Sequence, residues 1–124
     1  MTSDLRPKPF SLTVTPCEKN PDVALVQVSG YLDAHTVGEF ESVLIDDTKL
    51  FFRCYIVDAT GLYFISSAGI STLVRLVQLA RSRRGEVALL RPGEQVRSLM
   101  DLLSLNDLFH LVETREEAIS LFLT

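Results

Sequence analysis

Short apolar runs alternate with helical stripes along most of this chain, and this alternation constrains the fold more than any other feature of the sequence. β-Branched and aromatic residues are frequent in the short runs, as is typical of strands. The runs lie at residues 23–29, 51–57, 87–90 and 109–112. When strands and helices alternate, right-handed crossovers place the strands parallel in one sheet. The sequence therefore predicts an α/β domain with a largely parallel sheet.

The N-terminal part of the chain predicts a hairpin ahead of that alternation. Residues 10–15 alternate strictly between apolar and polar side chains, which indicates a strand with one solvated face at the edge of the sheet. Turn-forming residues follow at 20–22, and the more apolar strand at 23–29 ends at Gly30. We therefore expect a mixed, mostly parallel sheet with an N-terminal hairpin.

Two capping-box patterns mark the first and the last expected helix. A threonine is followed three residues later by a glutamate at residues 36–39 and again at 114–117. At this spacing the hydroxyl and the carboxylate satisfy amides that the first helical turn leaves unpaired. The residues expected to face the core are Val37, Phe40 and Leu44 in the first helix and Ala118, Leu121 and Phe122 in the last.

The clearest helical periodicity follows a loop that we expect at residues 58–64. Its apolar stripe consists of Ile70, Leu73, Val74 and Val77, with Arg75, Gln78 and Ser82 on the opposite side. Gly85 is well placed to end this helix. A further stripe follows Pro92, a residue that a first helical turn tolerates, and consists of Val96, Leu99, Met100 and Leu103. The chain thus predicts about four helices.

The composition is that of an ordinary soluble domain. At 124 residues the chain suits one domain, and 47% of its residues are apolar and 23% charged. The formal net charge of −4 disfavours a protein whose main task is to bind nucleic acid. A protein partner or a small ligand is the more favoured class.

Export, membrane insertion and metal binding find no support in the sequence. Residues 1–9 lack the apolar core of a secretory signal, and the most apolar stretch, residues 50–65, is interrupted by charges and shorter than the ~20 residues that a membrane span needs. We therefore expect a cytoplasmic protein without membrane insertion, in which Cys17 and Cys54 are reduced thiols. Two histidines and no Cys-x-x-Cys spacing give no support for a metal site.

Residues 65–70, with the sequence ISSAGI, lie where the expected loop enters the long helix. Helix N-termini present unpaired amides and a partial positive charge. A serine there can cap the helix, which is the common role, or can carry a phosphate. Position alone therefore leaves both roles open for Ser66 and Ser67.

Three blocks of the sequence resemble the signature of the STAS domains, the bacterial anti-sigma-factor antagonists. Residues 58–70, DATGLYFISSAGI, resemble the strand and apolar approach that lead to Asp-Ser-Ser/Thr-Gly-Leu in the family. Residues 30–36, GYLDAHT, resemble its Gly-Glu-Leu-Asp block, and residues 96–109 resemble its later helix and Leu-x-x-x-Phe turn. The implied organisation is an N-terminal arm at residues 1–9 and a single STAS-like α/β domain at residues 10–124.

The resemblance implies an anti-sigma-factor antagonist that switches partners and is not an enzyme. In the family, the serine two positions before the glycine is phosphorylated by a partner that is both an anti-sigma factor and a serine kinase, and here that serine is Ser67. The unphosphorylated chain would bind this partner, and phosphorylation would release it. Because the kinase holds ATP and Mg²⁺, no cofactor is expected, and a separate serine phosphatase would reset the switch.

The resemblance also outlines a partner-binding surface. Its residues are Asp33, Ser66, Ser67, Ala68 and Gly69. Ser66 stands where many family members carry Asp, which leaves it as a competing phosphate acceptor. Asp33 ends the second strand at the sheet edge from which the serine segment also emerges, and a turn-forming Asp is an equally good interpretation.

Other functions compete with this one. A two-component receiver would use Asp58 as its phosphoacceptor, but the acidic pair and the lysine that receivers need are missing. A STAS scaffold of a stressosome-like assembly, or the soluble subunit of a lipid-transport complex, would share the fold. An enzyme is disfavoured because a Gly-rich phosphate loop and a His-based catalytic base are lacking. The arginines at 81, 83 and 84 could form a phosphate or nucleic-acid patch, but solvated arginines that interact favourably with a helix C-terminus are the favoured interpretation.

Overall fold

The described chain folds into five strands and four α-helices in the order that the sequence predicts. The structure, a computed structural model, describes residues 10–46 and 52–122. The elements are β1 (Ser11–Pro16), β2 (Val23–Leu32), α1 (Val37–Leu44), β3 (Cys54–Ile65), α2 (Ser67–Ser82), β4 (Val87–Leu90), α3 (Glu94–Leu102), the short 3₁₀ helix η2 (Asn106–Leu108), β5 (His110–Val112) and α4 (Arg115–Phe122). The N-terminal arm expected at residues 1–9 and the start of the strand expected at Phe51 lie outside the described residues.

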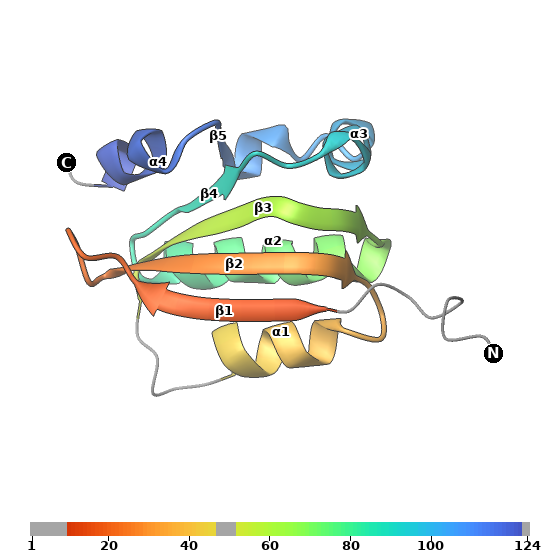
Figure 1. Cartoon of the computed structure of the whole chain (residues 1–124), viewed down its shortest axis with the longest axis horizontal. Coiled ribbons are helices and arrows are strands. Elements are labelled where there is room, and N and C mark those ends of the chain that lie inside the picture. The colour runs from red at the N-terminus through yellow and green to blue at the C-terminus, as the bar shows by residue number, and fades with distance from the viewer. Residues whose placement is uncertain (1–9, 47–51, 123–124) are drawn as a thin grey trace.

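The strands form one mixed sheet in the order β1-β2-β3-β4-β5 (Figure 1). β1 runs antiparallel to β2, with Val14 opposite Val26, whereas β2, β3, β4 and β5 are parallel to one another. Parallel neighbours require crossover connections, which α1, α2 and α3 supply. The predicted hairpin, the edge position of β1 and the mostly parallel sheet are confirmed.

Helices cover both faces of the sheet and bury two apolar clusters. The larger cluster joins the sheet to α1, α2 and α3, and includes Val26, Phe40, Val57, Leu73, Leu89 and Met100. The smaller cluster joins β3 and β4 to α4 and includes Ile56, Ala88, Leu90, Ala118 and Phe122. The free thiol of Cys54 belongs to this cluster, and the free thiol of Cys17 packs against it. Since successive strand residues point to opposite faces, the two clusters lie on opposite sides of the sheet. Among the described helices, none has the length and apolar character needed to cross a membrane.

β3 is longer than the sequence predicts, and the prediction of a loop at residues 58–64 is wrong. This segment stays extended because β2 also continues past Gly30 to Leu32 and pairs with it. Gly30 has a φ of 90°, and register shifts on either side of it keep the two strands paired. Turn-prone residues such as Asp58 and Gly61 are therefore held in a strand by a partner that is distant in sequence.

The predicted helical stripes are confirmed except at two leucines. The buried stripe residues include Phe40 and Leu44 in α1, Ile70, Leu73 and Val77 in α2, and Val96 and Met100 in α3. Leu103 is 45% exposed because α3 ends before it, and Leu121 is 43% exposed because α4 faces the sheet with Ala118 and Phe122. These two leucines lie just outside the faces that pack.

Two predictions about helix ends concern the capping pattern at the start of α4 and the glycine after α2. Thr114 Oγ1 accepts the N–H of Glu117 at 3.0 Å, as the capping pattern predicts. Glu117 Oε1 accepts the N–H of Glu113 at 3.0 Å, one residue before the expected one. Gly85 follows the end of α2, where a Cβ would lie 1.7 Å from the carbonyl oxygen of Arg53. Close packing therefore requires glycine there, whereas the left-handed conformation after α2 is taken by Arg84, with a φ of 62°, so the predicted role of Gly85 in ending the helix is wrong.

One buried polar side chain joins α1 to α2. Thr72, which is 1% exposed, donates from Oγ1 to Glu41 Oε2 at 2.5 Å, and Arg75 Nη1 lies 2.8 Å from the same oxygen. The hydrogen bond from Thr72 lowers the pKa of Glu41, and Arg75 lowers it further while burial opposes both. Thr72 and Arg75 therefore tie α2 to α1, which holds the two helices next to each other.

Leu73 lies on the buried face of α2, so its truncation tests the packing of that helix. We expect Leu73→Ala to lower the free energy of unfolding by about 2–5 kcal/mol, because the residue is 1% exposed and its loss leaves a cavity. Gln78→Ala, on the exposed side of the same helix, should change this free energy by less than about 0.5 kcal/mol. Urea denaturation measures both, and equal values for the two variants would contradict the packing.

Candidate functional site

The serine segment lies at the edge of the sheet where β2 and β3 end. Leu32 and Ile65 are paired in the parallel ladder and are the last residues of these strands. From there β2 leads toward α1 and β3 leads directly into α2, on the right-hand side of Figure 1. This edge therefore brings the loop that contains Asp33 next to the start of α2.

The two serines have different environments. Ser66 is the N-cap of α2, and its Oγ accepts the N–H of Gly69 at 3.3 Å. Its own N–H donates to the carbonyl oxygen of Leu32 at 3.0 Å. Ser66 is half-buried, whereas Ser67, the first residue of α2, is exposed. Ser66 thus holds the start of the helix, and Ser67 lies on the surface beside the helix N-terminus.

Gly69 permits a close approach between α2 and the end of β2. A Cβ at this position would lie 2.4 Å from the carbonyl oxygen of Leu32 and 2.6 Å from Cγ1 of Ile65. Both distances are much shorter than van der Waals contact, and the first involves backbone. Gly69 is buried, and Ala68 beside it is half-buried. The first turn of α2 packs against β2 in this way only when residue 69 has no side chain.

Asp33 stabilises the turn between β2 and α1. Its Oδ1 accepts the N–H of His35 at 2.9 Å, as a turn-forming Asp does. The predicted side-chain cap by Thr36 is wrong, although the helix begins directly after it. Thr36 Oγ1 instead donates to the carbonyl oxygen of Tyr31 at 2.8 Å and accepts the N–H of Asp33 at 3.0 Å. The hydroxyl that would cap α1 is therefore used to close the turn beside Ser66.

Gln95, which the sequence analysis did not identify, reaches the same edge from α3. Its Oε1 accepts the N–H of Ile65 at 2.9 Å, and its Nε2 donates to the carbonyl oxygen of Ile65 at 3.0 Å. The side chain pairs with the residue before Ser66 in the way that a neighbouring strand would. Gln95 is 30 residues from Ile65 in the sequence and belongs to no short motif, so no local signal marks it.

Aromatic side chains extend the surface beside the serines. Tyr63 is 60% exposed and Phe64 is 38% exposed. The ring of Tyr31 packs against that of Phe64, with their centroids 5.6 Å apart. These residues belong to the extensions of β2 and β3 that the sequence did not predict as strands. Tyr63 and Phe64 add exposed apolar area to the end of β3, the strand that leads into the serine segment.

Asp58, the phosphoacceptor of the receiver alternative, lies within β3 and not at the end of a strand. Its Oδ1 accepts the N–H of Thr60 at 3.0 Å, and its Oδ2 lies 3.8 Å from Arg115 Nη2. The side chain of Asp58 is only 14% exposed. The carboxylate is therefore engaged by its own strand and by α4.

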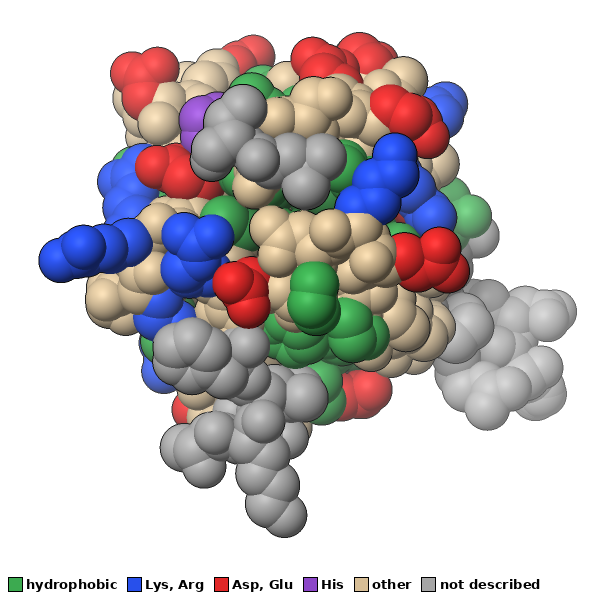
Figure 2. All heavy atoms as spheres, turned by 90° about the vertical axis from the view of Figure 1, so that its left-hand side faces the viewer, with side chains coloured by type: hydrophobic (Ala, Val, Ile, Leu, Met, Phe, Trp, Pro, Cys, Tyr) green, Lys and Arg blue, Asp and Glu red, His purple; other side chains and the backbone are tan. Residues whose placement is uncertain are grey.

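The arginines at the end of α2 lie far from the serines, at the end of the molecule that is on the left in Figure 1 and faces the viewer in Figure 2. Acidic side chains are interspersed with the basic ones on this face. Arg83 donates from Nη1 to the carbonyl oxygen of Phe52 at 2.9 Å and to the hydroxyl of Tyr55 at 3.3 Å. At least one of these arginines thus has a structural role, and the face shown carries mixed charge.

The close approach at Gly69 leads us to expect opposite effects of one substitution in two helices. Gly69→Ala should lower the free energy of unfolding by about 1–3 kcal/mol, because the added methyl group overlaps backbone of β2. Gly38→Ala is the matched control in α1. A Cβ at Gly38 meets no described atom within 4 Å, and alanine favours a helix over glycine by up to about 1 kcal/mol. Urea denaturation measures both variants, and a Gly69→Ala protein as stable as Gly38→Ala would contradict the close approach.

Comparison with known proteins identifies the family and the fold. The family model of the STAS domain matches residues 15–118. The crystal structure of an anti-sigma factor antagonist from Mycobacterium paratuberculosis is similar, with a TM-score of 0.75 and 22% sequence identity. That match covers 94% of this chain and 96% of the other.

Two structures of SpoIIAA are also similar. The anti-sigma factor antagonist SpoIIAA in its unphosphorylated form gives a TM-score of 0.72 at 22% identity, covering 90% of this chain and 94% of that one. The Bacillus cell fate determinant SpoIIAA in the phosphorylated form gives a TM-score of 0.70 at 19% identity, covering 89% of this chain and 97% of that one. Identities this low show a shared fold alone. The family match, however, spans most of the sequence, and the chain therefore belongs to the STAS domain family.

Proposed function

We propose that this chain is an anti-sigma-factor antagonist controlled by phosphorylation of Ser67. Unphosphorylated, it binds a partner that is both an anti-sigma factor and a serine kinase, and thereby frees the sigma factor. Phosphorylated, it releases that partner, and a separate serine phosphatase resets it. The observation that carries the proposal is the exposed Ser67 at the first residue of α2, next to a Ser66 that already caps the helix.

The environment of the two serines favours Ser67 as the phosphate acceptor. Ser66 is half-buried, and its Oγ holds the amide of Gly69. A phosphate on Ser66 would have to be accommodated at the point where α2 meets β2. Ser67 is exposed and lies one residue beyond the cap, so a kinase can reach its hydroxyl without disturbing the start of the helix.

A phosphate on Ser67 is also compatible with this end of α2. The N-terminus of a helix carries a partial positive charge and free amides, and residues 67–70 contain no acidic side chain. A phosphoserine carries about −1.5 to −2 charges. The chain itself accommodates this charge, whereas a partner surface that fits a neutral hydroxyl does not. The switch therefore acts at the interface and leaves the fold intact.

The proposed partner-binding surface comprises Asp33, Ser66, Ser67 and Ala68, together with Gly69, which is buried and sets the position of this segment from below. This proposal is supported by the contact between the end of β2 and the start of α2, where the carbonyl oxygen of Leu32, the residue before Asp33, accepts the N–H of Ser66. The kinase supplies ATP and Mg²⁺, so the chain acts without a cofactor and is not an enzyme. We place this activity in the cytoplasm, where bacterial transcription takes place.

Removal of the Ser67 hydroxyl should abolish phosphorylation. The assay uses the serine kinase that copurifies with the chain from its own cells, purified separately, with mass spectrometry to map the phosphate. We expect one phosphate on the wild type, at Ser67, and none on Ser67→Ala. Ser71→Ala removes another exposed hydroxyl from α2 and should behave as the wild type. A wild-type phosphate on Ser66, or undiminished phosphorylation of Ser67→Ala, would contradict the assignment.

Ser66→Asp tests whether the cap and the acceptor are separate residues. Aspartate caps helices about as well as serine does, so the free energy of unfolding should change by less than about 0.5 kcal/mol. Ser67 should still be phosphorylated, because its own hydroxyl and exposure are unchanged. A folded Ser66→Asp protein that the kinase no longer phosphorylates would show that Ser66 is itself recognised or modified.

A further inference from the structure

Among the residues that the structure describes, the last part of β3 has a strand neighbour on one side only. β4 pairs with β3 from Tyr55 to Asp58, whereas β3 continues to Ile65. On the other side, β2 follows this extension as far as Ile65, through a register with two irregularities. The segment that leads into the serines therefore forms an edge of the sheet on the side of β4.

At Ile65, the side chain of Gln95 takes the place of a neighbouring strand along this edge. The N–H and C=O of one strand residue point to the same side, and those of the next residue point to the other. Because Ser66 donates its N–H to β2, the polar groups of Ile65 point away from β2, toward Gln95. The side-chain amide of Gln95 binds both groups, at 2.9 and 3.0 Å. Ile65 is 0% exposed, so loss of Gln95 would leave two buried backbone groups unpaired.

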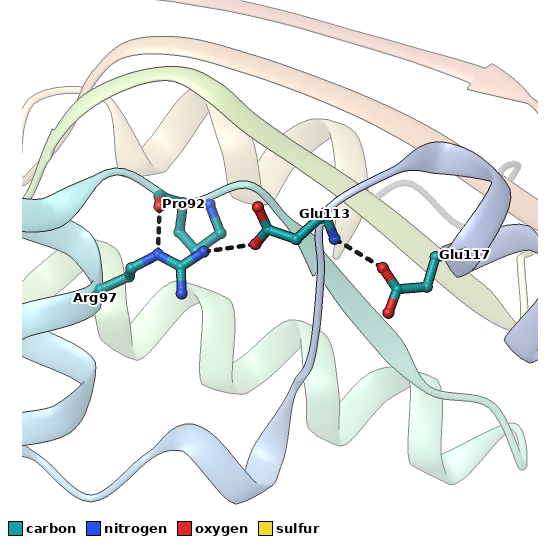
Figure 3. Close-up of polar contacts among 4 residues, drawn as sticks. All are labelled: Pro92, Arg97, Glu113 and Glu117. Carbon is teal, nitrogen blue, oxygen red and sulfur yellow. Dashed lines mark hydrogen bonds and ion pairs between the residues drawn. The ribbon is translucent and has the colours of Figure 1, made fainter.

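α3 holds Gln95 firmly because the helix is anchored on both sides. Val96 and Met100 are 0% exposed and pack in the larger apolar cluster. Figure 3 shows the polar anchor, in which Arg97 Nε donates to the carbonyl oxygen of Pro92 at 2.8 Å and Arg97 Nη2 to Glu113 Oε2 at 2.9 Å. Glu113 in turn donates its N–H to a carboxylate oxygen of α4. The start of α3 is thus tied to the segment after β4 and to the start of α4.

We propose that Gln95 is a positioning residue that holds the serine segment in the geometry needed for phosphorylation of Ser67. This inference rests on the function proposed above for Ser67. Two hydrogen bonds from one planar amide fix both the distance and the tilt of the backbone at Ile65, and Ser67 follows two residues later. Phosphoryl transfer depends on the placement of the attacking oxygen, and an error of about 1 Å can slow such a step by orders of magnitude. Gln95 acts through the backbone and needs no contact with the kinase.

Hydrogen exchange of the free protein tests the structural part of this inference. Gln95→Met removes both hydrogen bonds with little change in side-chain length, and Gln95→Glu keeps the acceptor but loses the donor. Gln78→Met makes the same change at an exposed position of α2 and is the matched control. In NMR-detected exchange, we expect the Ile65 amide to exchange about tenfold faster in Gln95→Met. The effect should be smaller in Gln95→Glu and absent in Gln78→Met.

Steady-state phosphorylation by the purified kinase tests the functional part. At temperatures well below unfolding, we expect Gln95→Met to lower kcat for phosphorylation of Ser67 roughly tenfold, with a smaller change in KM. The placement of the acceptor oxygen affects the phosphoryl-transfer step more than it affects binding of the chain to the kinase. Gln95→Glu should lie between this variant and the wild type, and Gln78→Met should match the wild type. A purely structural role of Gln95 would leave kcat and KM of the folded variants unchanged.

The outcomes separate this inference from the function on which it rests. If the wild type is phosphorylated at Ser67 but Gln95→Met has the same kcat, or the same exchange at Ile65, the positioning role is overturned and the proposed function stands. If the wild type is not phosphorylated at Ser67, both are overturned. Should Gln95→Met fail to fold, Gln95→Glu takes its place, and an unchanged kcat in that variant is the contradicting result.

Discussion

The carbonyl oxygen of Leu32, at the end of β2, is the group on which the candidate site depends. It accepts the N–H of Ser66, and Gly69 approaches it so closely that no side chain fits between them. These two contacts bring the turn that contains Asp33 against the first turn of α2. The serines therefore follow directly after the paired ends of two parallel strands, at the start of α2, and do not lie on a free loop.

Near this carbonyl group, one serine stabilises the start of α2 and the other is exposed on the surface. Ser66 caps α2 and is half-buried, while Ser67 is exposed at the first helical residue. On the β2 side the segment is held by Leu32, and on the other side Gln95 binds the backbone of Ile65. A charge added to Ser67 would therefore change the exposed surface at the start of α2, while the hydrogen bonds that hold the segment lie on neighbouring residues.

Structural features that depend on neighbouring residues could be predicted from the sequence. Features that depend on contacts between residues distant in the sequence could not. The stripe of α2 and the alternation of β1 depend on local periodicity, and both predictions are confirmed. The serine segment is contiguous, and its predicted place at the start of α2 is also confirmed. β3 was predicted too short because Asp58 and Gly61 favour turns, and only pairing with β2 keeps them extended. Thr36 has the spacing of a cap, but the carbonyl oxygen of Tyr31 takes its hydroxyl. Gln95 acts only because α3 crosses the end of β3, which no local pattern encodes.

The proposed switch is tested most directly by calorimetric titration of the proposed partner kinase with two forms of the wild-type chain. One form is unphosphorylated, and the other carries a single phosphate on Ser67. We expect the phosphorylated form to bind at least tenfold more weakly, a difference of about 1.4 kcal/mol or more in binding free energy. Its circular dichroism spectrum should be unchanged, and treatment with a serine phosphatase should restore binding. Equal affinity of the two forms, with the phosphate verified on Ser67, would contradict the switch.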